Sequence, residues 1–189
     1  FKQKAAYIWE YYKGVFAGII IACVIISIGV QMFQNSQLKS LLSIAVVDSN
    51  YNHDEQVEAL QNDFLAYAGT GDKHEVVDVD TSLISGDDYN AVVKMTVVMG
   101  AGTADMMFCG EETYKKYKQQ EAFLSWKEVL GDDYSKYEEY MTEDGRLDLE
   151  KCPNWEKYNM VYYSPVYAVV MSSSKNLENC IKFLEMMVQ

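Results

Sequence analysis

Four side chains that carry oxygen ligands alternate along one short segment of the chain: Asp48, Asn50, Asn52 and Asp54. This spacing is typical of the start of a calcium-binding loop, which also needs a glycine at its sixth position and a glutamate at its twelfth. The chain has His53 and Ala59 at those two positions. We therefore expect Asp48 to end a strand and Asp54 to cap a helix, with calcium binding as the alternative.

Catalytic chemistry has little support in the residue pattern. The two histidines, His53 and His74, stand on separate predicted loops, without an HExxH segment or a Cys and His pair at ligand spacing. No GxSxG segment is present. The glycine pairs at 69–71 and 100–102 follow predicted helices, so neither offers a helix N-terminus to a phosphate group. We expect neither an enzyme nor a bound metal or cofactor.

Polar residues follow three of the predicted strands. In an open α/β sheet, the loops at the carboxyl ends of parallel strands converge on one edge and form the usual ligand site. The candidate ligand-binding residues are Asp48, Asn50 and Tyr51 after the first strand, Asp80 and Ser82 after the second, and Gly110 and Glu111 after the third. Because the chain is acidic, the expected ligand is a cationic peptide or a cationic or metal-chelated small solute.

Three cysteines lie beyond residue 40. Cys109 ends a predicted buried strand and is expected to behave as a small apolar side chain. Cys152 and Cys180 form a candidate disulfide, although the sequence leaves open whether their sulfur atoms come within bonding distance.

The 189 residues are 49% apolar and suffice for one ordinary folded domain. The chain has 28 acidic and 16 basic side chains, and a net charge of −12 disfavours a nucleic-acid partner because an acidic surface repels a polyanion. The charge is unevenly distributed. Residues 1–39 carry four lysines and one glutamate, whereas residues 40–189 carry 12 basic and 27 acidic groups.

The N-terminal segment is predicted to be a membrane anchor. Residues 14–33 contain no charged side chain and are long enough to cross a bilayer as a helix. Residues 1–13 combine lysines with tyrosines and a tryptophan, as in a cytoplasmic flank at the headgroup level, and residues 34–40 form a polar tether. A signal peptide cleaved at Cys23 is the alternative. We therefore predict a single-pass protein of the cell membrane with a cytoplasmic N-terminus.

Residues 41–189 alternate between strand and helix patterns. Strands are predicted at 41–47, 76–79, 104–109 and 161–171, and helices at 54–68, 111–120 and 177–188. Residues 89–99 have the β-branched composition of a strand but helical spacing, and we favour a helix. This alternation predicts an α/β fold: one extracytoplasmic three-layer αβα lobe with a mixed, mostly parallel sheet.

Several segments in this order suggest a family. The strand Ser43–Val47, the segment Gly102–Met107 with Asp105, the stretch Ala122–Leu130 and the ending Tyr167–Leu184 lie in the order expected for one lobe. The arrangement resembles the first lobe of the extracellular solute-binding proteins of ABC transporters, which have the type 2 periplasmic-binding fold. The resemblance implies an extracytoplasmic binding protein of a transport system.

Two departures from that family change the expected function. Solute-binding proteins close two lobes around a solute, whereas residues 41–189 suffice for only one, and a predicted spanning helix replaces the lipid-modified cysteine. A single lobe cannot bury most of the surface of a small ligand. The resemblance with these departures therefore implies a non-catalytic accessory subunit that contacts an ABC transporter permease or a similar membrane protein complex.

Aromatic side chains near residues 131–163 are the predicted partner-contact surface, because aromatic residues are enriched in protein interfaces. They are Tyr134, Tyr137, Tyr140, Trp155, Tyr158, Tyr162 and Tyr163. The alternative is that the same side chains cover one end of the sheet.

Overall fold

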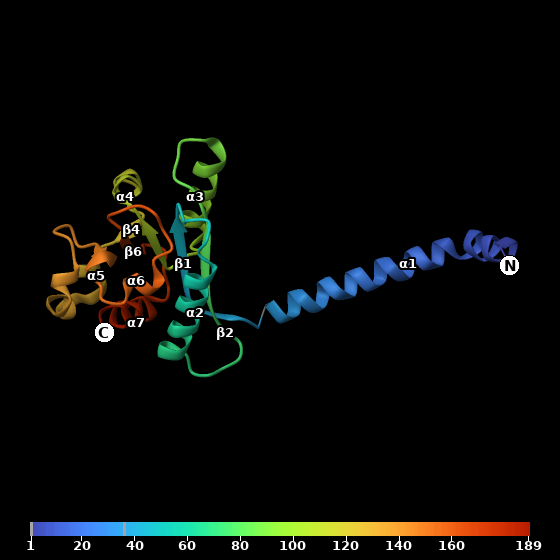
Figure 1. Ribbon diagram of the computed structural model, residues 1–189, viewed down its shortest axis with the longest axis horizontal. Coiled ribbons are helices and arrows are strands. Elements are labelled where there is room, and N and C mark those ends of the chain that lie inside the picture. Colours follow the sequence, from blue (N-terminus) through green and yellow to red (C-terminus); the bar gives the residue numbers. More distant parts are fainter. Residues whose placement is uncertain (1, 36) are drawn as a thin grey trace. The chain divides into compact units, whose positions relative to one another are not determined.

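The computed structural model describes residues 2–35 and 37–189, and within the first helix the side chains of Tyr12 and residues 14–30. The chain divides into two compact units, residues 1–38 and residues 39–189. The first unit contains helix α1 (Lys2–Asn35), and the second contains all the strands drawn in Figure 1.

The predicted membrane span is wrong. A helix that crosses a bilayer needs about 20 consecutive apolar residues, and no helix in the described part of the chain meets the requirement of length and apolarity. The side chains of the predicted flank 1–13, other than Tyr12, and those of residues 31–33 lie outside the described part of the chain.

The second unit contains a mixed sheet. Its strands are β1 (Lys39–Val47), β2 (Glu75–Leu83), β3 (Met106–Cys109), β4 (Phe123–Leu124), β5 (Leu147–Asp148) and β6 (Tyr167–Met171), in the order β2-β1-β3-β6-β4 with β5 also paired to β6. Strand β1 pairs in parallel with β2 and β3. Strand β6 runs antiparallel to β3, β4 and β5. The α/β fold with a mixed sheet is confirmed. The prediction of a mostly parallel sheet is wrong, because β6 begins beside the end of β3 and runs antiparallel to its three neighbours.

Helices flank this sheet. They are α2 (Asp54–Ala68), α3 (Tyr89–Ala101), α4 (Glu111–Lys118), α5 (Trp126–Leu130), α6 (Trp155–Tyr158) and α7 (Leu177–Val188), with short 3-10 turns at Gly131–Lys136, Glu138–Tyr140 and Leu149–Lys151. The segment that begins at Tyr89 is helical, as favoured, and Asp88 caps its start through two backbone N–H groups. His53, not Asp54, is the residue before the first turn of α2.

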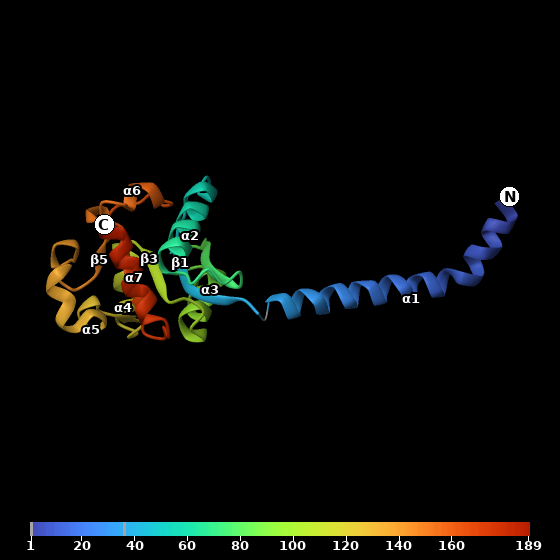
Figure 2. The ribbon, with the colours of Figure 1, turned by 90° about the horizontal axis from the view of Figure 1, so that it is seen from below.

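Two apolar cores lie on opposite faces of the sheet, because successive strand residues point to opposite sides. Leu42, Ile44 and Val46 of β1 pack with apolar residues of α2, α5, α6 and α7. Ala45 and Val47 pack with residues of α3 and α4 on the other face. The unit therefore has three layers, and Figure 2 shows α7 beside α2 in the first helix layer.

A buried carboxylate fixes the edge of the sheet where β3 begins. Asp105 is 6% exposed. Its side chain accepts hydrogen bonds from the Ser43 backbone N–H at 3.0 Å, the Ser174 hydroxyl at 2.8 Å and the Asn176 amide at 3.0 Å. These bonds join β1 and β3 to the segment before α7, at the edge of the sheet opposite to the carboxyl ends of β1 and β3.

Candidate functional site

Two adjoining cavities lie at the carboxyl ends of β1, β2 and β3, and we call them together the carboxyl-end cleft. The first, the β1–β2 cavity, has a volume of about 420 Å³. It is lined by Asp48, Ser49, Asn50, Tyr51, His53, Thr81, Ser82, Leu83, Ile84 and Tyr162. Four of these, Asp48, Asn50, Tyr51 and Ser82, are predicted ligand-binding residues.

The second, the β1–β3 cavity, has a volume of about 310 Å³. It is lined by Asp48, Ser85, Gly110, Glu111, Glu112, Thr113, Tyr162, Tyr163, Ser164 and Pro165. Gly110 and Glu111 are predicted ligand-binding residues. Because Asp48 and Tyr162 line both cavities, they form the wall between them.

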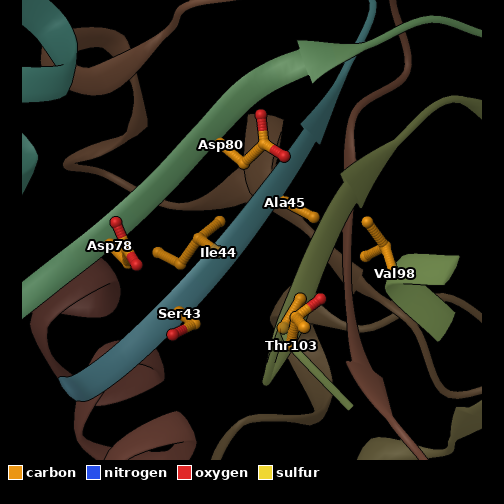
Figure 3. A pocket seen from close by; sticks show the side chains of 8 residues that line it. Ser43, Ile44, Ala45, Asp78, Asp80, Val98 and Thr103 are labelled. Carbon is orange, nitrogen blue, oxygen red and sulfur yellow. The ribbon is translucent and has the colours of Figure 1, made fainter. Parts of the chain in front are cut away.

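Asp80 lies apart from the other predicted residues. Strand β2 continues to Leu83, so Asp80 is inside the strand and not in the loop after it. It lines a smaller cavity of about 160 Å³ between β1, β2 and α3, together with Asp78 (Figure 3). Burial opposes ionisation of Asp80, but hydrogen bonds from the hydroxyl and backbone N–H of Ser82 outweigh it and lower the pKa of the carboxyl.

Asp48 has a backbone conformation that few residue types adopt. Its φ is +51°, in the left-handed region that Asp and Asn tolerate better than most side chains. The Asp48 carboxylate accepts a hydrogen bond of 2.8 Å from the Ser85 N–H, and the Asp48 N–H donates to the Leu83 carbonyl at 2.9 Å. The end of β1 is thereby tied to the segment after β2, which fixes the shared wall of the cleft.

Hydrogen bonds also fix the loop between β1 and α2. Both ring nitrogens of His53 are engaged, one by the Asn50 carbonyl and the other by the Thr81 hydroxyl at 2.8 Å. The Ser49 hydroxyl donates to the Thr81 carbonyl at 2.8 Å, and the Asn50 N–H donates to the Met160 carbonyl at 2.9 Å. The floor of the β1–β2 cavity is therefore held by three segments of the chain.

Large apolar side chains at this cavity remain open to solvent. Tyr51 is fully exposed, Tyr162 is 74% exposed and Ile84 is 63% exposed. An exposed apolar group rimmed by polar side chains is typical of an interaction site.

Tyr163 forms the inner wall of the β1–β3 cavity. A Cβ atom at Gly110 would lie 3.2 Å from the Tyr163 ring, so a larger residue there would press on the ring. The ring packs edge-on against Tyr162 with 6.2 Å between the ring centres. The Tyr163 hydroxyl is buried without a hydrogen-bond partner among the described residues. Burial of this hydroxyl raises its pKa.

The acidic groups of the cleft differ in how their charge is balanced. Glu111 forms ion pairs with Arg146 at 2.5 Å and Lys115 at 3.1 Å, and the hydrogen bond from Arg146 lowers the pKa of the Glu111 carboxyl. Within the described residues, neither Asp48 nor Glu112 has a basic partner within ion-pair distance. The cleft therefore retains negative charge beside its tyrosines.

The predicted aromatic contact surface is largely interior. Trp155 and Tyr158 are each 4% exposed, with Trp155 packed edge-on against Phe108 and the Tyr158 hydroxyl donating to Asp63 at 2.6 Å. Four others pack partly buried against the same core: Tyr134, Tyr137, Tyr140 and Tyr163. Of the seven, Tyr162 alone is exposed. These rings fill the space between residues 131–163 and the sheet because burial of their apolar area stabilises the fold.

The candidate disulfide does not form in the structure. Cys152 and Cys180 are both buried free thiols, and burial raises the pKa of each to about 12. Cys109 is also a buried free thiol, as expected for a side chain at the end of β3. Across residues 2–35 and 37–189, no three His, Cys, Asp or Glu side chains gather as a metal site.

Several lining residues were not predicted. Ile84 and Ser85 follow β2 directly and follow the same end-of-strand rule, but the predicted strand was four residues too short. Ser164 and Pro165 precede β6. They reach this edge only because β6 is antiparallel to β3, and local sequence has no signal for that direction.

Comparison of the chain with family models, with curated proteins and with solved structures finds no match. The resemblance to solute-binding proteins therefore remains a prediction from the residues quoted for it.

Proposed function

We propose that residues 39–189 form a non-catalytic binding domain that holds a cationic peptide segment of a partner protein in the carboxyl-end cleft. One observation carries the proposal. Exposed Tyr51, Ile84 and Tyr162 border a cleft in which Asp48 and Glu112 lack basic partners in the described part of the chain. Exposed apolar area supplies affinity, and the unpaired carboxylates select positive charge.

The same geometry supports binding over catalysis. His53 is the histidine in the β1–β2 cavity, and both of its ring nitrogens are already engaged by Asn50 and Thr81. A histidine that acts as a general base must reach the substrate proton through a free ring nitrogen. His53 therefore fits a role in holding the loop.

A small cationic solute is the second candidate ligand. The two cavities, about 420 Å³ and 310 Å³, fall within the range of small-molecule sites, roughly 300–1,000 Å³. The peptide is favoured because Tyr51, Tyr162 and Ile84 are exposed around the cavities, where they would contact a longer ligand. That the partner belongs to an ABC-type transporter, and that the domain is extracytoplasmic, remain predictions.

The test is a titration of a fluorescein-labelled peptide of alternating lysine and leucine against the full chain, followed by fluorescence anisotropy. We expect saturable binding that weakens between about 0.05 and 0.5 M salt, because screening shortens the reach of charge interactions. Asp48→Asn should weaken binding about threefold, since it removes one charge while keeping a residue that tolerates the left-handed backbone.

The matched control is Glu138→Gln, which makes the same charge change at an exposed site outside the cleft. The affinity of this variant for the peptide should equal that of the unsubstituted chain within experimental error. Equal binding of a glutamate and leucine peptide, or affinity that ignores salt, would refute the proposal.

A further inference from the structure

The two cavities of the carboxyl-end cleft differ in chemistry although they share a wall. Leu83, Ile84 and two tyrosine rings give the β1–β2 cavity a mainly apolar lining. The β1–β3 cavity has Glu111 and Glu112 on one side and the Tyr162 and Tyr163 rings on the other. This difference bears on which part of a ligand each cavity accepts.

A basic side chain already lies beside the first cavity. The Lys94 ammonium donates to the Ser82 carbonyl at 3.1 Å and also to the Ser82 hydroxyl. Ser82 lines the β1–β2 cavity. Asp48 also lines this cavity, but among the described residues it is the one carboxylate there, against three in the β1–β3 cavity, so of the two cavities this one better suits an uncharged apolar side chain.

The charge balance is the reverse in the second cavity. Arg146 lies behind Glu111, but its guanidinium is bound to both Glu111 and Asp144, so its charge is offset. Asp48 and Glu112 add negative charge at the mouth. The N-terminus of α4 would attract an anion, yet its first turn already carries two glutamates. A cation is therefore preferred in this cavity, where the carboxylates lie beside the two tyrosines.

We infer that the cleft recognises a two-part peptide motif, in which an apolar side chain enters the β1–β2 cavity and a lysine or arginine two residues away enters the β1–β3 cavity. In an extended peptide, side chains two positions apart point the same way and lie about 7 Å apart. Asp48 and Tyr162 stand between the two side chains. The inference rests on the proposed function, because it assigns parts of the same cleft.

The test uses peptides with a Gly and Ser background that contain Lys-Ala-Leu or Leu-Ala-Lys, each with matched Gln-for-Lys and Ala-for-Leu versions. Affinities are measured by calorimetry for the full chain and two variants, Glu112→Gln and Ile84→Ser. For one of the two peptides, Lys-Ala-Leu or Leu-Ala-Lys, we expect replacement of the lysine by glutamine to weaken binding about fivefold. Replacement of its leucine by alanine should weaken binding about tenfold.

The variants should respond selectively. Glu112→Gln should remove most of the benefit of the lysine and leave that of the leucine, whereas Ile84→Ser should do the opposite. Lys127→Gln and Val97→Ser, at exposed positions outside the cleft, are the control substitutions, and circular dichroism checks that each variant is folded.

The outcomes separate the two claims. If no peptide binds, the proposed function fails. Peptides could instead bind while each variant reduces the contributions of the peptide lysine and leucine to the affinity equally, or reduces neither contribution. In that case the proposed function stands and the assignment of the two cavities is overturned.

Discussion

At the residue scale, the positions of several cleft side chains could be predicted from the sequence. The residues that form ion pairs with them could not be predicted. Asp48, Asn50 and Tyr51 reach the cleft because they follow a parallel strand. Glu111 also follows a strand, but its charge state in the site depends on Arg146, which is 35 residues away. No local pattern links those two residues, so the sequence could place Glu111 at this edge but could not predict its ion pair with Arg146.

Arg146 is the centre of a cluster that sets a pH dependence. Its guanidinium stacks on the rings of Tyr114 at 4.3 Å and Tyr167 at 4.0 Å. Burial alone would raise the pKa of Asp144, but hydrogen bonds from Thr142 and Arg146 outweigh it and lower that pKa to about 2. Asp144 therefore stabilises the fold most when it is ionised.

We expect Asp144→Asn to flatten the acid dependence of stability. The folded pKa lies below the unfolded value of about 3.9, so the contribution of Asp144 is complete above about pH 4 and is lost as the pH falls toward 2. Because Asp144 is about one-third exposed, the expected loss is on the order of 1 kcal/mol. Urea unfolding at several pH values measures it, and parallel curves for the two proteins would contradict it.

At the scale of elements, helix and strand types followed the hydrophobic pattern, whereas strand direction and short elements did not. The apolar runs at β1 and β3 are buried on both faces, and the segment at α3 is a helix that Asp88 and Gly102 cap and whose Met95 and Val98 are buried. Strands β4 and β5 have two residues each and depend on β6 for their pairing. Such elements exist only through tertiary contact.

The two glycines near the end of α3 should respond oppositely to alanine. Gly102 has a φ of +62°, and alanine there would strain the backbone and touch Ser173, so Gly102→Ala should lower the free energy of unfolding by about 1 kcal/mol. Gly100 is helical with open space around its Cβ position, so Gly100→Ala should raise it by up to about 1 kcal/mol. Urea denaturation of both variants measures these changes in the free energy of unfolding. Changes of the same sign would contradict the assignment of the helix end.

At the scale of the whole molecule, the fold depends on residues 39–189. Among the residues that the structure describes, those that build the two apolar cores lie at or beyond Leu41. The chain divides into its two units at Leu38. The uneven distribution of charge along the sequence thus coincides with a structural division, although the membrane span predicted for residues 14–33 was wrong.

A chain of residues 39–189 should therefore fold by itself. We expect one cooperative urea transition, with a free energy of unfolding within about 0.5 kcal/mol of that of the full chain, since residues 39–189 form a compact unit by themselves. Intrinsic tryptophan fluorescence follows the transition because Trp126 and Trp155 are buried in the first core. A midpoint well below that of the full chain would show that residues 1–38 stabilise the domain.

The sequence by itself determined the α/β alternation, the apolar central strands and the placement of Asp48, Asn50, Tyr51, Ser82, Gly110 and Glu111 at one edge, because these follow from local periodicity and from where strands end. Tertiary structure decided the direction of β6, the burial of Trp155 and Tyr158, and the pairing of Glu111 with Arg146. The physical reason is that apolar attraction has no direction: an aromatic side chain suits a core or a surface equally until distant segments have packed around it.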